Sequence, residues 1–312
     1  MLSIGIDLGG TNIAAGVVTS EGKVIAQAQR PTLAQRPWQQ VVEDMAEVSL
    51  DALAMAGVGV EQVHAIGVGV PGNYDRKNGV VVFCTNLGWH NVPLREAMRR
   101  YIDVPLYADN DANVAAFAEA MAGVSRNVYS SLLLTLGTGV GSGIIVDGKI
   151  WSGSHGVAGE VGHMIYRAGG EQCTCGQRGC FERYASATAL IRIAREATMR
   201  YPDSEMKSIP PERMNAKTVV DAARRGDEAA MEAFDEYTTH LSLGIVSCIN
   251  VFDPGMIVLG GGVSRAGDFL LEPVRRKVEK QKFFKALPIG GVELATLGND
   301  AGIIGAALLH RT

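Results

Sequence analysis

The sequence has no apolar run of the roughly 18 or more residues that a membrane-spanning helix needs. Its first residues, Met-Leu-Ser-Ile-Gly-Ile-Asp, also lack the basic segment, the apolar core and the cleavage site of a signal peptide. Both absences lead us to expect a cytoplasmic protein with no membrane partner.

An excess of positive charge is absent as well. The 29 Lys and Arg residues are outnumbered by 33 Asp and Glu residues, which gives a formal net charge of −4. Proteins that bind nucleic acid through their overall charge need the opposite balance, so we expect no nucleic-acid partner. The hydrophobic residues make up 47% of the 312 residues and suffice for the cores of one long or two ordinary domains.

Cysteine is scarce, with five residues in the chain. Cys84 and Cys248 stand alone in apolar surroundings, which predicts small buried core residues. The remaining three are clustered: Cys173, Cys175 and Cys180. In a reducing compartment such clustering favours a metal over a disulfide, and three thiolates with the nearby His163 satisfy tetrahedral zinc. Four protein ligands close the coordination shell, so we expect this zinc to be structural.

Glycine is plentiful, and two glycine-rich turns each lie between apolar stretches that are typical of buried strands. The first turn lies within Ile6-Asp7-Leu8-Gly9-Gly10-Thr11-Asn12, and the second lies within residues 134–143. Backbone amides in such hairpins can approach phosphate oxygens, because glycine has no Cβ. Two of them in one chain indicate two related domains that act on one triphosphate. A dinucleotide-binding motif fits poorly, because no helix opens at a third glycine after Gly137-Thr138-Gly139.

The first hairpin carries an acidic residue at the end of its leading strand. Asp7 can hold hydrated Mg²⁺, while the loop amides and the Thr11 hydroxyl contact phosphate. The same residues also fit an ordinary glycine hairpin in which an Asp stabilises the turn. The second hairpin favours the phosphate-binding interpretation.

Asn110 and Asp111 stand where a strand meets a helix. A sugar hydroxyl is a weak nucleophile, so a phosphoryl transferase needs a carboxylate to accept its proton, and Asp111 can do this while Asn110 orients the sugar. Both residue types are also common helix N-caps, and this segment alone favours capping.

Glu160 and Glu182 flank the cysteine cluster. Their carboxylates can accept hydrogen bonds from sugar hydroxyls, although isolated residues of this kind are more often solvated.

The predicted elements repeat one plan in two halves. The first half has strands at 2–8, 13–18, 23–28, 63–70 and 106–108, and helices at 38–57, 94–101 and 111–121. The second half has strands at 131–136, 142–146, 149–151 and 256–259, a helix-rich stretch from 185 to 251 and a terminal helix at 302–309. This order predicts an α/β protein with two domains of related construction.

Together these motifs resemble the ROK family of sugar kinases and related repressors, within the actin-like ATPase superfamily. The resemblance is carried by Asp7-Leu8-Gly9-Gly10-Thr11, by the run from Leu134 to His163, and by Cys173-x-Cys175-Gly-x-x-Gly-Cys180. It implies an α/β fold of two actin-like (ribonuclease H-like) domains with a cleft between them. Residues 1–118 with 299–312 would form the small N-terminal domain, and 119–298 the large domain with the zinc-binding loop.

The resemblance also assigns roles. Asp111 matches the catalytic base. The sugar-binding positions are Gly72, Asn86, Asn110, Asp111, Glu160, His163 and Glu182. The ATP- and phosphate-binding positions are Asp7, Gly9, Gly10, Thr11, Asn12, Thr138, Gly139, Gly261 and Gly262. The zinc ligands are His163, Cys173, Cys175 and Cys180, and His163 would face the sugar with its second ring nitrogen. ATP, Mg²⁺ and a structural Zn²⁺ are the implied cofactors, and a homodimer or homotetramer is the implied assembly.

The implied activity is that of an ATP-dependent hexose kinase of carbohydrate metabolism that phosphorylates the sugar 6-hydroxyl. Asn86-Leu87-Gly88-Trp89 most resembles the glucokinases of the family, which favours glucose as the substrate. N-acetylmannosamine, N-acetylglucosamine, fructose and allose stay open, because the same motifs serve kinases for all of them. A non-catalytic sugar-sensing repressor is the remote alternative. Such repressors carry an N-terminal helix-turn-helix extension, whereas here the phosphate motif begins at residue 7.

Overall fold

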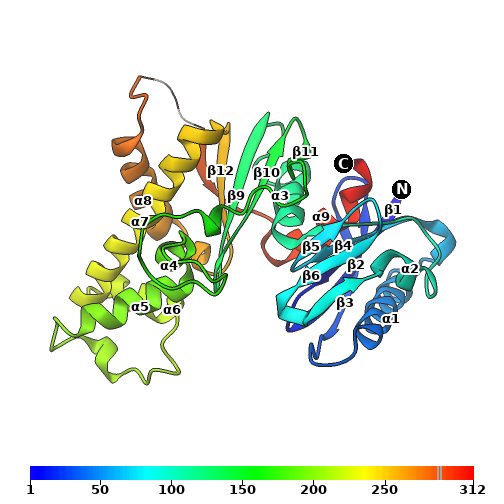
Figure 1. Cartoon of the computed structure of the whole chain (residues 1–312), viewed down its shortest axis with the longest axis horizontal. Helices are drawn as coiled ribbons and strands as arrows, with labels where there is room; N and C mark the ends of the chain where they lie inside the picture. The colour runs from blue at the N-terminus through cyan, green and yellow to red at the C-terminus, as the bar shows by residue number, and fades with distance from the viewer. Residues whose placement is uncertain (287, 289) are drawn as a thin grey trace. The chain divides into compact units, whose positions relative to one another are not determined.

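The computed structural model describes residues 1–286, 288 and 290–312, and the chain forms two compact units (Figure 1). The first unit comprises Met1–Ser131, Gly143–Gly159 and Thr296–Thr312, and the second comprises Leu132–Ser142 and Glu160–Ala295. The expected α/β fold class is confirmed, because each unit combines strands with helices. The domain boundaries after residues 118 and 298 stay predictions.

A mixed five-stranded sheet with the order β3-β2-β1-β4-β8 is the centre of the first unit. Its strands are β1 (Leu2–Leu8), β2 (Asn12–Thr19), β3 (Val24–Pro31), β4 (Val63–Val70) and β8 (Leu106–Asn110). β1, β4 and β8 run parallel to one another. Because the carboxyl ends of parallel strands meet at one edge of a sheet, Asp7 and Asn110 lie at the same edge.

The helices of the first unit are α1 (Trp38–Ala56), α2 (Leu94–Arg99), α3 (Asp111–Ala122) and α9 (Ala301–Leu308). α1 ends where Gly57 adopts a left-handed φ of 66°, as predicted. A separate three-stranded sheet, which the sequence did not predict, consists of β5 (Asn73–Asp75), β6 (Val80–Cys84) and β7 (Trp89–Val92).

The two faces of the five-stranded sheet differ, because alternating side chains of a strand point to opposite sides. One face of β1 is buried in a core with α1 and α2 through three apolar side chains: Ile4, Ile6 and Leu8. On the other face, Gly5 and Gly67 lie directly against α9 (Figure 1). A Cβ on Gly5 would stand 1.8 Å from the carbonyl oxygen of Ile303, so the missing side chain allows α9 to pack on the sheet.

A second five-stranded sheet has the order β11-β10-β9-β12-β13. Its strands are β9 (Ser130–Leu136), β10 (Val140–Val146), β11 (Lys149–Ile150), β12 (Met256–Gly260) and β13 (Gly291–Leu294). The helices of the second unit are α4 (Glu182–Ala185), α5 (Ala187–Thr198), α6 (Ala216–Arg224), α7 (Glu228–Phe252) and α8 (Asp268–Gln281). The expected helix-rich stretch is confirmed by α4 to α7, whereas α8 and β13 were not predicted.

The expected absence of spanning segments agrees with the helices: across the described residues, none is both long and apolar enough to cross a membrane. Cys84 and Cys248 are both buried, as the sequence predicts. Their thiols serve as small core groups, and burial raises the pKa of Cys248 to about 12.

Candidate active site

The first glycine hairpin joins β1 to β2 and is held by a residue that the sequence did not reveal. The Gly9 amide donates to the Asn12 carbonyl oxygen at 2.9 Å. Thr32, which is fully buried, contacts both arms of the turn: its amide donates to the Thr11 carbonyl at 2.8 Å and its hydroxyl to the Gly9 carbonyl at 2.6 Å. These bonds engage the carbonyl oxygens of Gly9 and Thr11 and fix the conformation of the turn.

Asp7 is the second-last residue of β1 and lies on the face of the sheet that carries α9. The added Cβ of a side chain at Gly302, in the first turn of α9, would stand 2.5 Å from Asp7 Oδ2. Burial in this position raises the pKa of Asp7. A carboxylate that has lost much of its hydration is stabilised by a nearby cation, so Asp7 fits the role of holding hydrated Mg²⁺.

Asn110 is the N-cap of α3, so the capping interpretation is correct for this residue. Its Oδ1 accepts hydrogen bonds from the amides of Ala112 at 2.9 Å and Asn113 at 3.3 Å. Its Nδ2 donates to the Gly72 carbonyl at 3.4 Å, which brings two of the predicted sugar-binding residues together. Asp111 is the first helical residue and is exposed.

Asn86 follows β6 in a short 3₁₀ turn and is exposed. A Cβ on Gly10 would stand 3.5 Å from the Cβ of Asn86, so the first glycine hairpin and this predicted sugar-binding residue are neighbours. Gly72 packs more closely on the end of β6, because its added Cβ would be 2.9 Å from the Cα of Cys84. The first unit therefore assembles Gly10 with Asn86, and Gly72 with Asn110, at the edge where β1 and β8 end.

The second hairpin joins β9 to β10 and is held by the beginning of α5. The Ala187 amide donates to the Gly137 carbonyl at 2.8 Å, and the Thr188 hydroxyl donates to the Thr138 carbonyl at 2.8 Å. Gly261, whose φ is 83°, packs on the end of β9: its added Cβ would stand 2.6 Å from the Leu136 nitrogen. Gly262 follows directly and begins a 3₁₀ turn. The ATP- and phosphate-binding positions predicted in the second unit are thus adjacent.

The turn that carries Glu160 and His163 lies directly on β10. The Val161 amide donates to Ser142 Oγ at 3.1 Å, and a Cβ on Gly162 would stand 2.0 Å from the Val140 carbonyl oxygen. The Glu160 side chain is exposed, and its backbone carbonyl accepts from the His163 amide at 3.0 Å. Glycine at position 162 is therefore required for this turn to approach the strand.

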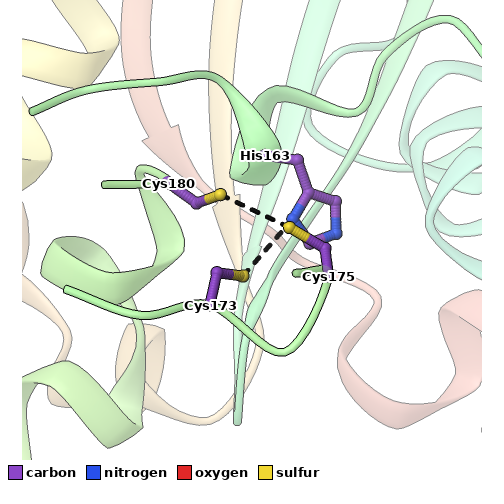
Figure 2. A group of neighbouring side chains, drawn as sticks. All are labelled: His163, Cys173, Cys175 and Cys180. Carbon is purple, nitrogen blue, oxygen red and sulfur yellow. Dashed lines mark hydrogen bonds between the residues drawn. The ribbon is translucent and has the colours of Figure 1, made fainter. Parts of the chain in front are cut away.

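Three cysteines and a histidine form a compact cluster in the second unit, as the sequence predicts (Figure 2). Their ligand atoms all lie within 4.8 Å of one another. Cys175 Sγ and Cys180 Sγ are 3.5 Å apart, and Cys173 Sγ is 3.8 Å from His163 Nδ1. A tetrahedral zinc with Zn–S bonds of about 2.3 Å separates its sulfur ligands by about 3.8 Å. The cluster therefore has the size and the donor atoms that fit a closed zinc site.

Glu182 connects this cluster to the second hairpin. Its Oε1 accepts from the Cys173 thiol at 2.9 Å and lies 4.0 Å from His163 Nδ1. Its Oε2 accepts from the Val140 amide at 3.4 Å. Burial, followed by the hydrogen bond to Glu182, raises the pKa of Cys173 to about 12 in the absence of a metal. Glu182 and His163, two predicted sugar ligands, are thus brought together.

Known proteins share this sequence and fold over nearly the whole chain. The ROK family profile matches residues 3–312. A glucokinase from Thermotoga maritima is 36% identical over 307 residues, which cover 97% of this chain and 95% of that protein. The crystal structure of a ROK family glucokinase from Streptomyces griseus, in complex with glucose and AMPPNP, superimposes with a TM-score of 0.84 at 34% identity and 98% coverage of both chains. The xylose repressor of Caldicellulosiruptor bescii is 32% identical over 77% of this chain and 60% of its own length.

Proposed function

The chain belongs to the ROK family, and we propose that it is an ATP-dependent hexose kinase that converts glucose to glucose 6-phosphate. The observation that carries this proposal is the likeness, over 98% of both chains, to a glucokinase solved with glucose and AMPPNP. The two-domain actin-like architecture of such kinases agrees with the two compact units. ATP and a sugar are the small-molecule partners, and the cytoplasm is the compartment we propose. The homodimer or homotetramer stays a prediction.

In this proposal Asp111 is the general base. Its carboxylate accepts the proton of the sugar 6-hydroxyl while that oxygen bonds to the γ-phosphorus and ADP leaves. Its exposure at the N-terminus of α3 supports the role, because a substrate can reach the carboxylate. Asn110, with its Nδ2 beside the Gly72 carbonyl, and Asn86 beside Gly10 would orient the sugar.

The phosphates of ATP would contact the two glycine hairpins. Gly9, Gly10, Thr11 and Asn12 serve this role in the first unit, and Thr138 and Gly139 serve it in the second, with Gly261 and Gly262 on the adenosine side. Asp7 would hold Mg²⁺ through water, and the bound ion supplies positive charge that stabilises the transferring phosphoryl group. The engagement of the Gly9, Thr11, Gly137 and Thr138 carbonyls elsewhere supports these assignments.

Zinc would be held by His163, Cys173, Cys175 and Cys180 in a structural role. Because His163 Nδ1 faces Cys173 Sγ, its Nε2 is the nitrogen available to a sugar hydroxyl. Glu160 and Glu182 would accept hydrogen bonds from the same sugar. Glu182, whose side chain is 14% exposed, would accept this bond in addition to those from Cys173 and Val140.

The experiment that tests this function is a coupled assay with ATP and a panel of sugars. We expect kcat/KM to be highest for glucose, compared with N-acetylmannosamine, N-acetylglucosamine, fructose and allose. A higher value for one of the other sugars would replace glucose and leave the kinase standing. Absence of ADP formation with every sugar would instead favour the repressor-like alternative.

A further inference from the structure

Asp109, the residue before Asn110, is a buried carboxylate whose two oxygens have separate partners. It is 5% exposed. Its Oδ1 accepts from the Asn110 amide at 2.8 Å and from Asn113 Nδ2 at 2.9 Å. Its Oδ2 accepts from Arg76 Nε at 2.7 Å and from Arg76 Nη2. One oxygen therefore holds the start of α3, while the other holds a guanidinium from the turn after β5.

Asn113 shows that Asp109 dictates the local arrangement. Asn113 is 4% exposed, and its side-chain oxygen has no hydrogen-bond partner among the described residues. Turning the amide over would place this oxygen against the Asp109 carboxylate, with two acceptors facing each other. The orientation that leaves one oxygen unsatisfied is the one that Asp109 favours. The backbone amide of Asn113 also donates to Asn110 Oδ1, so Asp109, Asn110 and Asn113 form one network.

Arg76 supplies the charge that this network needs. A buried carboxylate without a cationic partner is strongly disfavoured. Arg76 reaches Asp109 from the surface, with 43% of its own side chain exposed. Its backbone is held in turn by Arg95, whose Nη2 donates to the Arg76 carbonyl at 2.5 Å. The ion pair forms part of the wall of an open hollow of about 450 Å³, which Tyr74, Tyr107 and Leu309 also line.

We propose that Arg76 and Asp109 are positioning residues for the proposed base, Asp111. This inference rests on the kinase function proposed above. The pair fixes the backbone at Asn110 and the first turn of α3, and this turn carries the Asp111 carboxylate toward its substrate. If Arg76 is removed, the buried Asp109 loses its cationic partner and must shift, which alters its bonds to Asn110 and Asn113. Because displacement of a catalytic group by about 1 Å can cost 10²-fold in rate, the effect should appear in kcat.

The test is Arg76→Ala, with Arg99→Ala as the matched control. Arg99 also pairs with an aspartate, Asp103 at 3.1 Å, but both side chains are exposed. We expect Arg76→Ala to lower kcat by about tenfold to a hundredfold, with little change in KM for ATP, and Arg99→Ala to leave both parameters unchanged. Millimolar ethylguanidinium should restore much of the lost kcat, because the hollow gives a free guanidinium access to Asp109.

A second variant, Arg76→Lys, tests the inference if Arg76→Ala does not fold. Lysine retains the positive charge but cannot bond Asp109 through two nitrogens, so we expect a kcat below that of the wild type but above that expected for Arg76→Ala. Wild-type kcat in Arg76→Ala, or a loss that ethylguanidinium does not reverse in a folded variant, overturns the inference. A wild-type protein without kinase activity overturns the proposed function instead, so the two failures are distinguishable.

Discussion

The carboxylate of Glu182 lies so close to Gly139 that a Cβ on this glycine would stand 2.3 Å from Glu182 Oε2. The second glycine hairpin and a proposed sugar ligand therefore share one packed contact in the second unit. A substitution at Gly139 must displace Glu182, so it cannot report on ATP binding alone. Gly137 is different, because its added Cβ would find the Gly139 carbonyl oxygen only at 4.0 Å.

We expect Gly137→Ala to raise KM for ATP about fivefold, which corresponds to roughly 1 kcal/mol of lost phosphate contact, and to leave KM for glucose nearly unchanged. Gly139→Ala should raise both constants, because it also moves Glu182. Steady-state kinetics with each substrate varied in turn provide the measurement. Equal effects of Gly137→Ala on the two constants would indicate a purely structural turn.

Asp111→Asn should lower kcat by about 10²–10⁴-fold, the usual scale for loss of a general base. The amide has the same shape, and Asn110 retains the helix cap, so the melting temperature should change little. Glucose binding, measured by calorimetry, should survive. Turnover close to that of the wild type in the folded variant would assign the reaction to another base.

Metal analysis of the purified protein should find about one zinc per chain. Cys175→Ser should lose the metal and raise KM for glucose more than KM for ATP, because His163 and Glu182 lie at the cluster. Cys248→Ala is the matched control, since this buried cysteine lies outside the cluster and should retain zinc. Zinc-free protein with full activity would rule out the structural metal.

Thr32→Val retains the shape of the side chain and removes the hydroxyl that bonds the Gly9 carbonyl at 2.6 Å. We expect KM for ATP to rise more than KM for glucose, because the first hairpin loses support directly, whereas Asn86 is affected only through its contact with Gly10. The free energy of unfolding should fall by about 1–3 kcal/mol, because the Gly9 carbonyl loses the hydrogen bond from the Thr32 hydroxyl. Thr32→Ser keeps the hydroxyl and should behave like the wild type. A higher KM in both variants would contradict this explanation.

Local patterns in the sequence predicted the long and strongly periodic elements. The strands at 2–8 and 63–70 match β1 and β4 residue for residue, and Gly57 ends α1. The hairpin strands β5 to β7 were missed because they have three to five residues and mixed burial, with Phe83 47% exposed. α8 was missed because Pro273 lies within it. Apolar spacing also does not guarantee burial: Leu50 fits the spacing of α1, yet it is 42% exposed.

In the candidate site, too, local sequence patterns predicted some residues and missed others. The glycines, the cysteines and Asp111 stand in short sequence motifs and could be predicted. The residues that hold these motifs in place come from elsewhere in the chain: Thr32 bonds Gly9 across 23 positions, and Arg76 bonds Asp109 across 33. Neither partner has a distinctive neighbourhood in the sequence. Only the folded sheet brings them together, so no local pattern could have indicated them.

The packing of α9 on Gly5 and Gly67 has a consequence for biosynthesis. β1 and β4 are made early, whereas the helix that covers this face of their sheet is made some 230 residues after β4, at Ala301–Leu308. A nascent chain on the ribosome must therefore carry an incomplete first unit while the whole second unit is translated. Final closure of the first unit must wait until α9 has been synthesised, and chaperones that bind nascent chains would meet its glycine-lined face before α9 does.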